Sequence, residues 1–226
     1  MAEIAFRNVQ HRFGERTVLA GIDLTLAEHR IGIVGANGSG KSTMARMING
    51  LVSPTSGTVT VDGLDTTAKG RDVRRKVGFV FTDPDNQIVM PTVAEDVGFS
   101  LRRSGLSKEQ LADRVAQTLT RFGLAGHADH PTHLLSGGQK QLLALAAVLV
   151  TRPQVIVADE PTTLLDLRNA RMVSDLLYGM PEQLVLVTHH LHLLDGFDRV
   201  VVIDAGRVVA DGPPADALPA YTGLLA

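Results

Sequence analysis

The chain has 226 residues, of which 44% are hydrophobic, enough for one sizeable core or two tightly joined subdomains. Its formal net charge of −2 provides no general basic field, which argues against nucleic acid as a partner. Zero cysteines exclude disulfides and thiolate metal sites. The longest apolar run, residues 142–150, is far shorter than the ~20 residues of a membrane-spanning helix, so we expect no such helix.

Short runs rich in β-branched residues recur along the chain and predict strands. These runs are 4–9, 31–34, 58–61, 77–81, 155–158, 184–187 and 199–203. Several of them lack polar alternation, which indicates strands buried on both faces of a mainly parallel sheet with helices packed around it. The sequence therefore predicts an α/β core.

Helical patterns replace the strand pattern between residues 91 and 150. The predicted helices are 94–103, 108–122 and 139–150. Ser107 is a suitable N-cap, and Gly105 and Gly123 lie where helices would end. We therefore predict that a helical subdomain is inserted into the sheet domain.

The expected division of the chain follows from these patterns. Residues from 213 onward include three prolines and carry little structural signal, so we expect a short C-terminal tail there. The predicted parts are a core of residues 1–87 and 151–212, a helical subdomain of residues 88–150, and a tail of residues 213–226.

A glycine-rich loop fits the pattern GxxxxGK[ST] between the predicted strand 31–34 and a predicted helix at 42–49. Its backbone N–H groups and the helix start are expected to cradle phosphates, with Lys41 neutralising the β and γ groups. The Ser42 hydroxyl is the expected Mg²⁺ ligand, and Thr43 a further phosphate contact. The candidate nucleotide-binding residues of this loop are Asn37, Gly38, Ser39, Gly40, Lys41, Ser42 and Thr43.

A second glycine-rich sequence, Leu-Ser-Gly-Gly-Gln at residues 135–139, opens another predicted helix. Ser136 is a good N-cap, and the glycines let backbone N–H groups approach a ligand closely. Such a helix start favours an anion, so the chain carries two phosphate sites that one nucleotide cannot use within one subunit. The candidate residues are Ser136, Gly137, Gly138 and Gln139.

An acidic pair, Asp159 and Glu160, follows the predicted strand 155–158, where α/β sheets place their ligand sites. Asp159 is expected to hold Mg²⁺ through water, and Glu160 to orient or deprotonate the attacking water. Taken alone, such a pair is often only a helix N-cap, but the phosphate loop favours the catalytic interpretation. His189 follows strand 184–187 at the same edge and is expected to donate a hydrogen bond to a γ-phosphate.

Together and in this order, these motifs resemble the nucleotide-binding subunit of an ABC transporter. The resemblance spans most of the chain and implies a P-loop NTPase core with a mainly parallel sheet, an antiparallel β subdomain and an inserted helical subdomain. It also implies hydrolysis of ATP with Mg²⁺. Two subunits would meet head to tail, so that Ser136 and Gly138 of one close on the γ-phosphate held by Lys41 of the other.

Three further positions are identified through this resemblance. Asp166 matches the loop that crosses the dimer interface, and Phe13 stands where an aromatic ring stacks on adenine, although it could equally be a core residue of the first hairpin. Thr82 occupies the place where the family has a glutamine that reaches Mg²⁺ and the water. Because threonine is shorter, we expect ATP binding to survive, with the Thr82 hydroxyl acting through a bridging water; Gln87 is too far along the chain to be assumed a substitute.

A finer resemblance lies in residues 83–87 (Asp-Pro-Asp-Asn-Gln) and 91–97 (Pro-Thr-Val-Ala-Glu-Asp-Val), which are similar to the ATPases of energy-coupling factor importers for vitamins and metal ions. It implies a transmembrane T component and a substrate-binding S component as partners, at the cytoplasmic face of the bacterial inner membrane. Asp85, Glu95 and Asp96 are expected to meet basic side chains of the T component. Alternatively, they are helix-start carboxylates that complement a dipole, worth ~0.3–1 kcal/mol each.

The expected cargo follows from the compact length, which resembles the ATPase of biotin importers. Biotin is the first expectation, and cobalt or nickel the alternative; the ATPase itself would not contact the transported substrate. The alternative class is a soluble ABC-type ATPase, but that class usually needs tandem cassettes or long coiled-coil inserts. The second ATPase subunit is expected to be a copy of this chain, while a heterodimer stays open.

Overall fold

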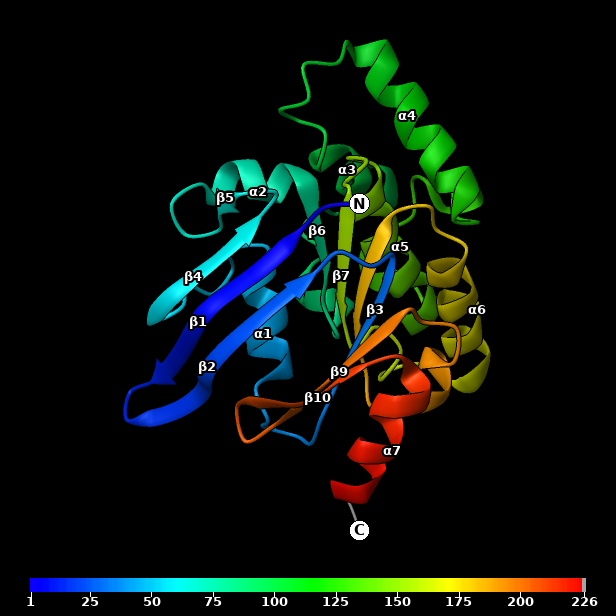
Figure 1. Cartoon of the computed structure of the whole chain (residues 1–226). Helices are drawn as coiled ribbons and strands as arrows, with labels where there is room; N and C mark the ends of the chain where they lie inside the picture. Colours follow the sequence, from blue (N-terminus) through cyan, green and yellow to red (C-terminus); the bar gives the residue numbers. More distant parts are fainter. Residues whose placement is uncertain (225–226) are drawn as a thin grey trace. The chain divides into compact units, whose positions relative to one another are not determined.

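The computed structural model describes residues 1–224 and divides into two compact units (Figure 1). The second unit comprises Val80–Pro153 and Pro161–Met180, and the first comprises the remaining described residues. The strands are β1 (Ile4–Phe13), β2 (Arg16–Leu26), β3 (Arg30–Val34), β4 (Ser56–Val61), β5 (Leu64–Asp65), β6 (Val77–Val80), β7 (Val155–Asp159), β8 (Gln183–Val187), β9 (Arg199–Asp204) and β10 (Arg207–Gly212).

The helices divide between the two units. The α-helices are α1 (Lys41–Ile48), α2 (Gly70–Lys76), α3 (Val93–Phe99), α4 (Lys108–Arg121), α5 (Gly137–Leu149), α6 (Leu167–Tyr178) and α7 (Pro214–Leu224). Short 3₁₀ turns are η1 (Pro84–Asn86), η2 (Ala125–His127), η3 (Thr132–Leu134) and η4 (Leu191–Leu194). Within residues 1–224, none of the helices combines the length and apolar character needed to cross a bilayer.

The described strands form two sheets. One is four-stranded, in the order β2-β1-β4-β5, and its neighbouring strands pair antiparallel. The other is six-stranded, in the order β10-β9-β3-β8-β7-β6, with parallel pairing of β3 to β8 and β9 and of β7 to β8. Strands β3, β7 and β8 are buried along their whole length, as their unbroken apolar runs predicted. The α/β class and the two kinds of sheet are thus confirmed.

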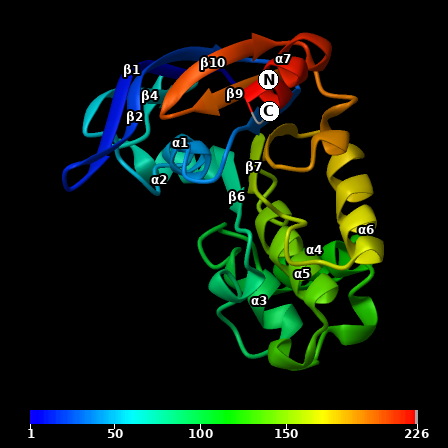
Figure 2. The ribbon, with the colours of Figure 1, turned by 90° about the horizontal axis from the view of Figure 1, so that it is seen from below.

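Helix α1 brings the phosphate loop against the first unit's core. It packs on β4, β7 and β8, and Figure 2 shows it beside the four-stranded sheet. Its inward face consists of Met44, Ala45, Met47 and Ile48, all fully buried. Burying the two methionines and the isoleucine contributes roughly 1.5–3 kcal/mol each, so the helix start is held in place by apolar packing behind it.

All seven predicted strands fall on observed strands, but other elements escaped prediction. Strand β2 alternates buried and exposed residues only irregularly, because register shifts interrupt its pairing with β1.

Helix α3 ends at Phe99, four residues before the predicted end at residue 103. There the chain tightens into turns in which Leu101 donates to the Gly98 carbonyl, three residues back.

The segment predicted as a tail from residue 213 instead contains helix α7. Pro214 begins this helix, where the missing N–H costs nothing, and Pro219 lies inside it. Ala217 and Tyr221, one turn apart, are buried, and the helix packs on β9 and β10. Tertiary packing therefore stabilises a helix whose prolines had suggested an irregular end.

The second unit is built from α3, α4, α5 and α6. Helix α4 begins after Ser107, as predicted: the Gln110 N–H donates to the Ser107 hydroxyl (3.2 Å), and the Ser107 N–H donates to Gln110 Oε1 (2.9 Å). Helix α5 packs on α3, α4 and α6. The expected helical subdomain of residues 88–150 lies within this unit, which also includes α6.

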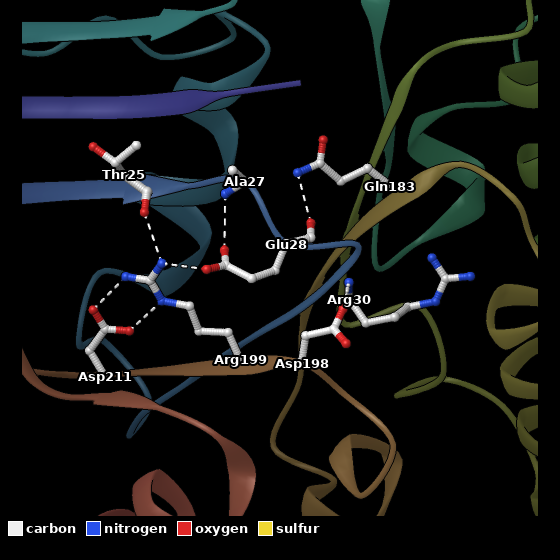
Figure 3. A network of polar contacts seen from close by, with 8 residues as sticks. All are labelled: Thr25, Ala27, Glu28, Arg30, Gln183, Asp198, Arg199 and Asp211. Carbon is white, nitrogen blue, oxygen red and sulfur yellow. Dashed lines mark hydrogen bonds and ion pairs between the residues drawn. The ribbon is translucent and has the colours of Figure 1, made fainter. Parts of the chain in front are cut away.

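A polar network in the first unit joins the amino ends of β8 and β9 to the carboxyl ends of β2 and β10 (Figure 3). Arg199 donates to both carboxylate oxygens of Asp211 (2.6 and 2.7 Å), to Glu28 Oε1 (2.8 Å) and to the Thr25 carbonyl (2.9 Å). Its hydrogen bonds to Asp211, and after them the one to Glu28, raise the pKa of Arg199 against the effect of burial. Gln183 links β8 to the same place by donating to the Glu28 carbonyl (2.9 Å). This network fixes the strand ends opposite to those that carry Asp159 and Glu160.

Candidate functional site

The phosphate loop connects β3 to α1, and α1 begins without a side-chain cap. Its N-cap residue is Gly40, at φ 108° and ψ 0°, a conformation that only glycine adopts without strain. A Cβ there would also lie 2.8 Å from the Val18 carbonyl oxygen. No acidic residue occupies the first turn. The first N–H groups of α1 are therefore left for a ligand, and a negatively charged one is favoured by the helix dipole.

Lys41 is held inside the loop. Its Nζ donates to the carbonyl oxygens of Gly35 (2.7 Å) and Ala36 (2.9 Å), and the residue is only 6% exposed. Burial lowers the pKa of Lys41, while the nearby carboxylates of Glu160 and Asp159 act in the opposite direction. The ammonium group thus shapes the loop and places a cation beside the acidic pair.

A pocket of about 300 Å³ lies over this loop in the first unit. Its lining consists of Phe13, Arg16, Val18, Asn37, Gly38, Gly40, Lys41, Ser42, Thr43 and Glu160. Phe13 is 58% exposed, so its ring is an accessible wall of the pocket rather than a core residue of the hairpin. Ser39 does not line the pocket; it is buried within the loop.

Asp159 ends β7 directly beside the start of α1. Ser42 Oγ donates to Asp159 Oδ1 (2.8 Å), and Arg46 Nη2 lies 3.4 Å from Asp159 Oδ2. Burial raises the pKa of Asp159, whereas the Ser42 hydrogen bond and the Arg46 charge lower it. A carboxylate and a hydroxyl are hard oxygen donors of the kind that Mg²⁺ prefers, so Asp159 and Ser42 would fit that ion.

Glu160 is held in a strained conformation. It lies at φ 52°, which is uncommon for a residue with a side chain and costs of order 1–3 kcal/mol. Its N–H donates to the Val187 carbonyl (2.9 Å). His189 Nδ1 lies 2.8 Å from Glu160 Oε2, which leaves His189 Nε2 as the nitrogen that can meet a ligand. The carboxylate therefore projects into the pocket with an imidazole beside it.

The second glycine-rich sequence begins α5 in the second unit. The Gln139 N–H donates to Ser136 Oγ (3.3 Å), and the Ser136 N–H donates to Gln139 Oε1 (2.9 Å), a complete capping box. Gln139 also lies 3.0 Å from His127 Nε2 through its Nε2. Gly137 and Gly138 occupy the first two helical positions, and their N–H groups lie outside this box.

Asp166 caps the neighbouring helix α6 in the same unit. Its Oδ1 accepts from the Asn169 N–H and its Oδ2 from Asn169 Nδ2, both at 2.8 Å. A Cβ on Gly138 would collide with the Asn169 side chain. Asn169 thus packs against the glycine-rich helix start and ties it to Asp166. The sequence did not identify Asn169 as a site residue, because no local pattern around it predicts its contact with Gly138.

The segment around Thr82 is also fixed within the second unit. Gln87 accepts from the Phe81 N–H (3.1 Å) and donates to the Ala144 carbonyl (3.0 Å). Both ends of its amide are therefore engaged inside the unit. Gln141 donates to the Phe81 carbonyl (3.3 Å). Thr82 itself is half-buried.

The three carboxylates expected to face a partner differ in their surroundings. Asp96 is only 3% exposed and accepts from the N–H groups of Val89 (2.8 Å) and Met90 (2.9 Å), so it does not present a surface charge and that expectation is wrong. Glu95 bonds Thr92 in the capping box of α3. The Asp85 side chain is 63% exposed and pairs with Lys140 at 2.7 Å.

The structure thus gathers the predicted site residues into two groups. In the first unit, Lys41, Ser42, Asp159, Glu160 and His189 meet through the contacts above. In the second unit, the 136–139 helix start lies next to the Asp166 cap through Asn169. Arg16 and Arg46 are additional charged residues of the first group that the sequence did not single out.

Comparison with known proteins gives a family and full-length relatives. Residues 19–163 match the model of a family described as ABC transporter. A protein of Deinococcus radiodurans, provisionally named an ABC transporter ATP-binding protein, is 53% identical and covers 96% of each chain. The biotin transport ATP-binding protein BioM of Rhizobium etli is 45% identical and covers 99% of each.

Two further comparisons concern energy-coupling proteins and a solved structure. The energy-coupling factor transporter ATP-binding protein EcfA1 of Bacillus subtilis is 39% identical, over 95% of this chain and 78% of its own. The structure of cbiO1 from Clostridium perfringens, part of the ABC transporter complex cbiONQ, superposes with a TM-score of 0.83 at 31% identity. That match covers 98% of this chain and 92% of cbiO1.

Proposed function

The chain belongs to the ABC transporter family of ATP-binding proteins, and we propose that it is the ATP-hydrolysing subunit of an energy-coupling factor importer for biotin. Like its relatives, it is an ATPase that powers transport. The observation that carries the residue assignments is the Glu160–His189 pair, 2.8 Å apart, on the wall of the pocket that contains Lys41.

ATP binds in the pocket over the phosphate loop, with its base against Phe13. The uncapped N–H groups of α1 bind the phosphates, and Lys41 neutralises the β and γ groups. The cost of breaking the Lys41 hydrogen bonds to Gly35 and Ala36 is offset by charge-assisted bonds to phosphate, which are about twice as strong as neutral ones. Asn37, Gly38, Ser42 and Thr43, which line the pocket, complete this binding site, while Ser39 is buried in the loop between them.

Hydrolysis uses the acidic pair beside the phosphates. The oxygen of a water molecule forms a bond to the γ-phosphorus while Glu160 accepts a proton from that water. The bond between the γ-phosphorus and the ADP oxygen breaks, which releases ADP and phosphate. His189 holds Glu160 through Nδ1, and its Nε2 meets the γ-phosphate; donation from both nitrogens at once takes the doubly protonated ring. Asp159 and Ser42 would hold Mg²⁺, whose charge neutralises the phosphate oxygens.

Two copies of the chain bind ATP between them. The N–H groups of Gly137 and Gly138, with Ser136 and Gln139, meet the γ-phosphate held by Lys41 of the other copy, and Asp166 lies at the interface. Changing the ratio of closed to open dimer from 1:99 to 99:1 requires that ATP bind the closed dimer more tightly than the open one by about 5.5 kcal/mol. Hydrogen bonds to a charged group, at ~1.5–3 kcal/mol each, supply this with a few contacts.

Biotin is the proposed cargo because the biotin transport relative matches this chain over 99% of both lengths. Cobalt or nickel import is the second candidate, favoured by the structural likeness to cbiO1. The chain would act at the cytoplasmic face of the membrane, bound to transmembrane T and substrate-binding S components, without touching the cargo. Co-purification from detergent-solubilised membranes, followed by identification of the bound vitamin or metal, distinguishes the two.

The catalytic assignment is tested by Glu160→Gln. The amide keeps the size of the side chain but cannot take the proton, so we expect ATP turnover to fall by roughly 10²–10⁴-fold. The variant should still bind ATP, and a stable ATP-bound dimer should accumulate. Light scattering after size-exclusion chromatography measures the mass of that dimer. Glu3→Gln, at an exposed carboxylate of the same unit, is the matched control and should behave as wild type. Undiminished turnover in Glu160→Gln would remove Glu160 from this role.

A further inference from the structure

Arg16 lies on the wall of the nucleotide pocket through the geometry of the first hairpin. It begins β2 and pairs directly with Phe13 of β1 across a two-residue turn. Residues directly opposite each other on antiparallel strands project from the same face of the sheet. Both side chains accordingly line the pocket that also contains Lys41.

The guanidinium of Arg16 reaches the phosphate loop itself. A Cβ built on Gly38 would lie 3.3 Å from Arg16 Nη2, so the missing side chain of Gly38 leaves room for this approach. Gly38 is three residues before Lys41 in the loop. The charged group is therefore placed between the aromatic wall formed by Phe13 and the start of α1.

The two cations of the pocket are engaged differently. Lys41 donates to two loop carbonyls and faces Glu160 and Asp159. Arg16, by contrast, is exposed, and within residues 1–224 the structure gives it no hydrogen bond or ion pair. A guanidinium carries five N–H donors in a planar fork that matches phosphate oxygens. An unpaired fork on the wall of a phosphate pocket is suited to an anionic ligand.

We propose that Arg16 is a nucleotide-binding residue that holds the phosphate nearest the ribose. This inference rests on the proposed ATP site, in which Phe13 takes the base and Lys41 the β and γ phosphates. Arg16 lies next to Phe13 and against Gly38, so it meets the part of the nucleotide between those two ends. That part is common to ATP and ADP, and Arg16 accordingly binds both without distinguishing them.

The test is nucleotide binding to the full-length Arg16→Gln variant, measured by calorimetric titration with ATP and with ADP. Loss of a charge-assisted, forked contact should weaken both by about 10–100-fold and leave their ratio unchanged. The logarithm of the dissociation constant should also rise less steeply with the logarithm of salt concentration, because one cation has been removed. Arg16→Lys keeps the charge without the fork and should fall between wild type and Arg16→Gln.

Arg12→Gln is the matched control. Arg12 is one residue from Phe13 on β1, is exposed, donates to the Glu15 carbonyl and does not line the pocket. Its loss should leave both affinities at the wild-type value. If Arg16→Gln binds ATP as wild type does, or loses ATP affinity but retains ADP affinity, the assignment of Arg16 is overturned. If wild type itself binds neither nucleotide, the proposed function fails instead. Thermal unfolding of each variant checks that the fold is retained.

Discussion

Two helices of this chain start with glycine-rich sequences, but the two starts are completed in different ways. Helix α1 has Gly40 as its N-cap, in a left-handed conformation and with no side-chain cap. Helix α5 has Ser136 as its N-cap and closes a capping box with Gln139. The start of α1 leaves its backbone N–H groups available to a ligand within its own unit. At the start of α5, the side chains of the capping box satisfy some of the backbone N–H groups.

This difference indicates which of the two starts depends on a ligand. At α1, the loop is shaped around the space that phosphates would fill, with Lys41 held beside it by backbone carbonyls. At α5, the capping box stabilises the helix whether or not an anion is bound, while Gly137 and Gly138 keep their N–H groups outside the box. A helix start of the second kind can remain folded until another molecule brings an anion to it.

The largest effect is expected from Gly40→Ala. Alanine would be strained at φ 108°, and its Cβ would overlap Leu19 Cδ2 (2.7 Å) and the Val18 carbonyl oxygen (2.8 Å). Strain and overpacking together should lower the free energy of unfolding by about 2–4 kcal/mol, measured by urea denaturation. Calorimetric titration should show weakened ATP binding, because the phosphate loop must shift to accept the methyl group.

Gly137→Ala is the matched substitution at the other helix start. Gly137 has no left-handed φ, and a Cβ there meets nothing within 4 Å. We expect its stability to stay within about 1 kcal/mol of wild type, since alanine is the better helix former. A loss of stability equal to that of Gly40→Ala would show that the two glycines serve the same structural purpose. The difference drawn between the two helix starts would then be wrong.

A smaller effect is expected from Ser136→Ala, which opens the capping box of α5. Loss of an N-cap side chain typically costs ~1 kcal/mol, which urea denaturation measures. Ser107→Ala is a close control, because Ser107 and Gln110 form the same box at the start of α4. Both variants should lose similar stability, but only Ser136→Ala should reduce ATP turnover in the assembled dimer. Equal turnover in the two variants would leave Ser136 as a structural cap alone.

Features encoded by a few consecutive residues were predictable from the sequence. The phosphate loop, the Ser107 cap and the buried strands β3, β7 and β8 each follow from local spacing or an apolar run. The edge at which Glu160 and His189 meet also followed, because the carboxyl ends of neighbouring parallel strands come together. These are cases in which chain geometry alone decides the placement.

Features decided by packing between distant segments were not predictable. Arg16 reaches Gly38 only because of the hairpin register, and Asn169 meets Gly138 only through the packing of α6 on α5. The burial of Asp96 was also not predictable from the sequence. As a first-turn carboxylate of α3 it suggested an exposed charge, but the chain folds back so that residues 89 and 90 donate their N–H groups to it.

The two units each contain a buried carboxylate, and these two carboxylates differ in their hydrogen-bond and charge partners. Asp159 in the first unit has both a hydroxyl partner, Ser42, and a cation, Arg46. Asp96 in the second unit accepts from the backbone N–H groups of Val89 and Met90. Burial raises the pKa of both, and in Asp96 the two N–H groups oppose that rise only in part. Asp96 therefore provides the simpler test of what burial does to stability.

The smallest effect is expected as a change in the pH dependence of stability in Asp96→Asn. Because the folded-state pKa of Asp96 is raised above its ordinary value of 3.8, the folded chain binds the proton more tightly than the unfolded chain does. This contribution to stability is fully present below pH 3.8 and is lost as pH rises through the folded-state pKa. Asparagine keeps an oxygen for the N–H groups of Val89 and Met90 but does not titrate. The unfolding free energy of wild type minus that of Asp96→Asn, measured by urea denaturation from the acid side upward, should therefore decrease with pH. A difference that stays constant, or that increases, would mean that Asp96 is ionised in the folded chain at no cost.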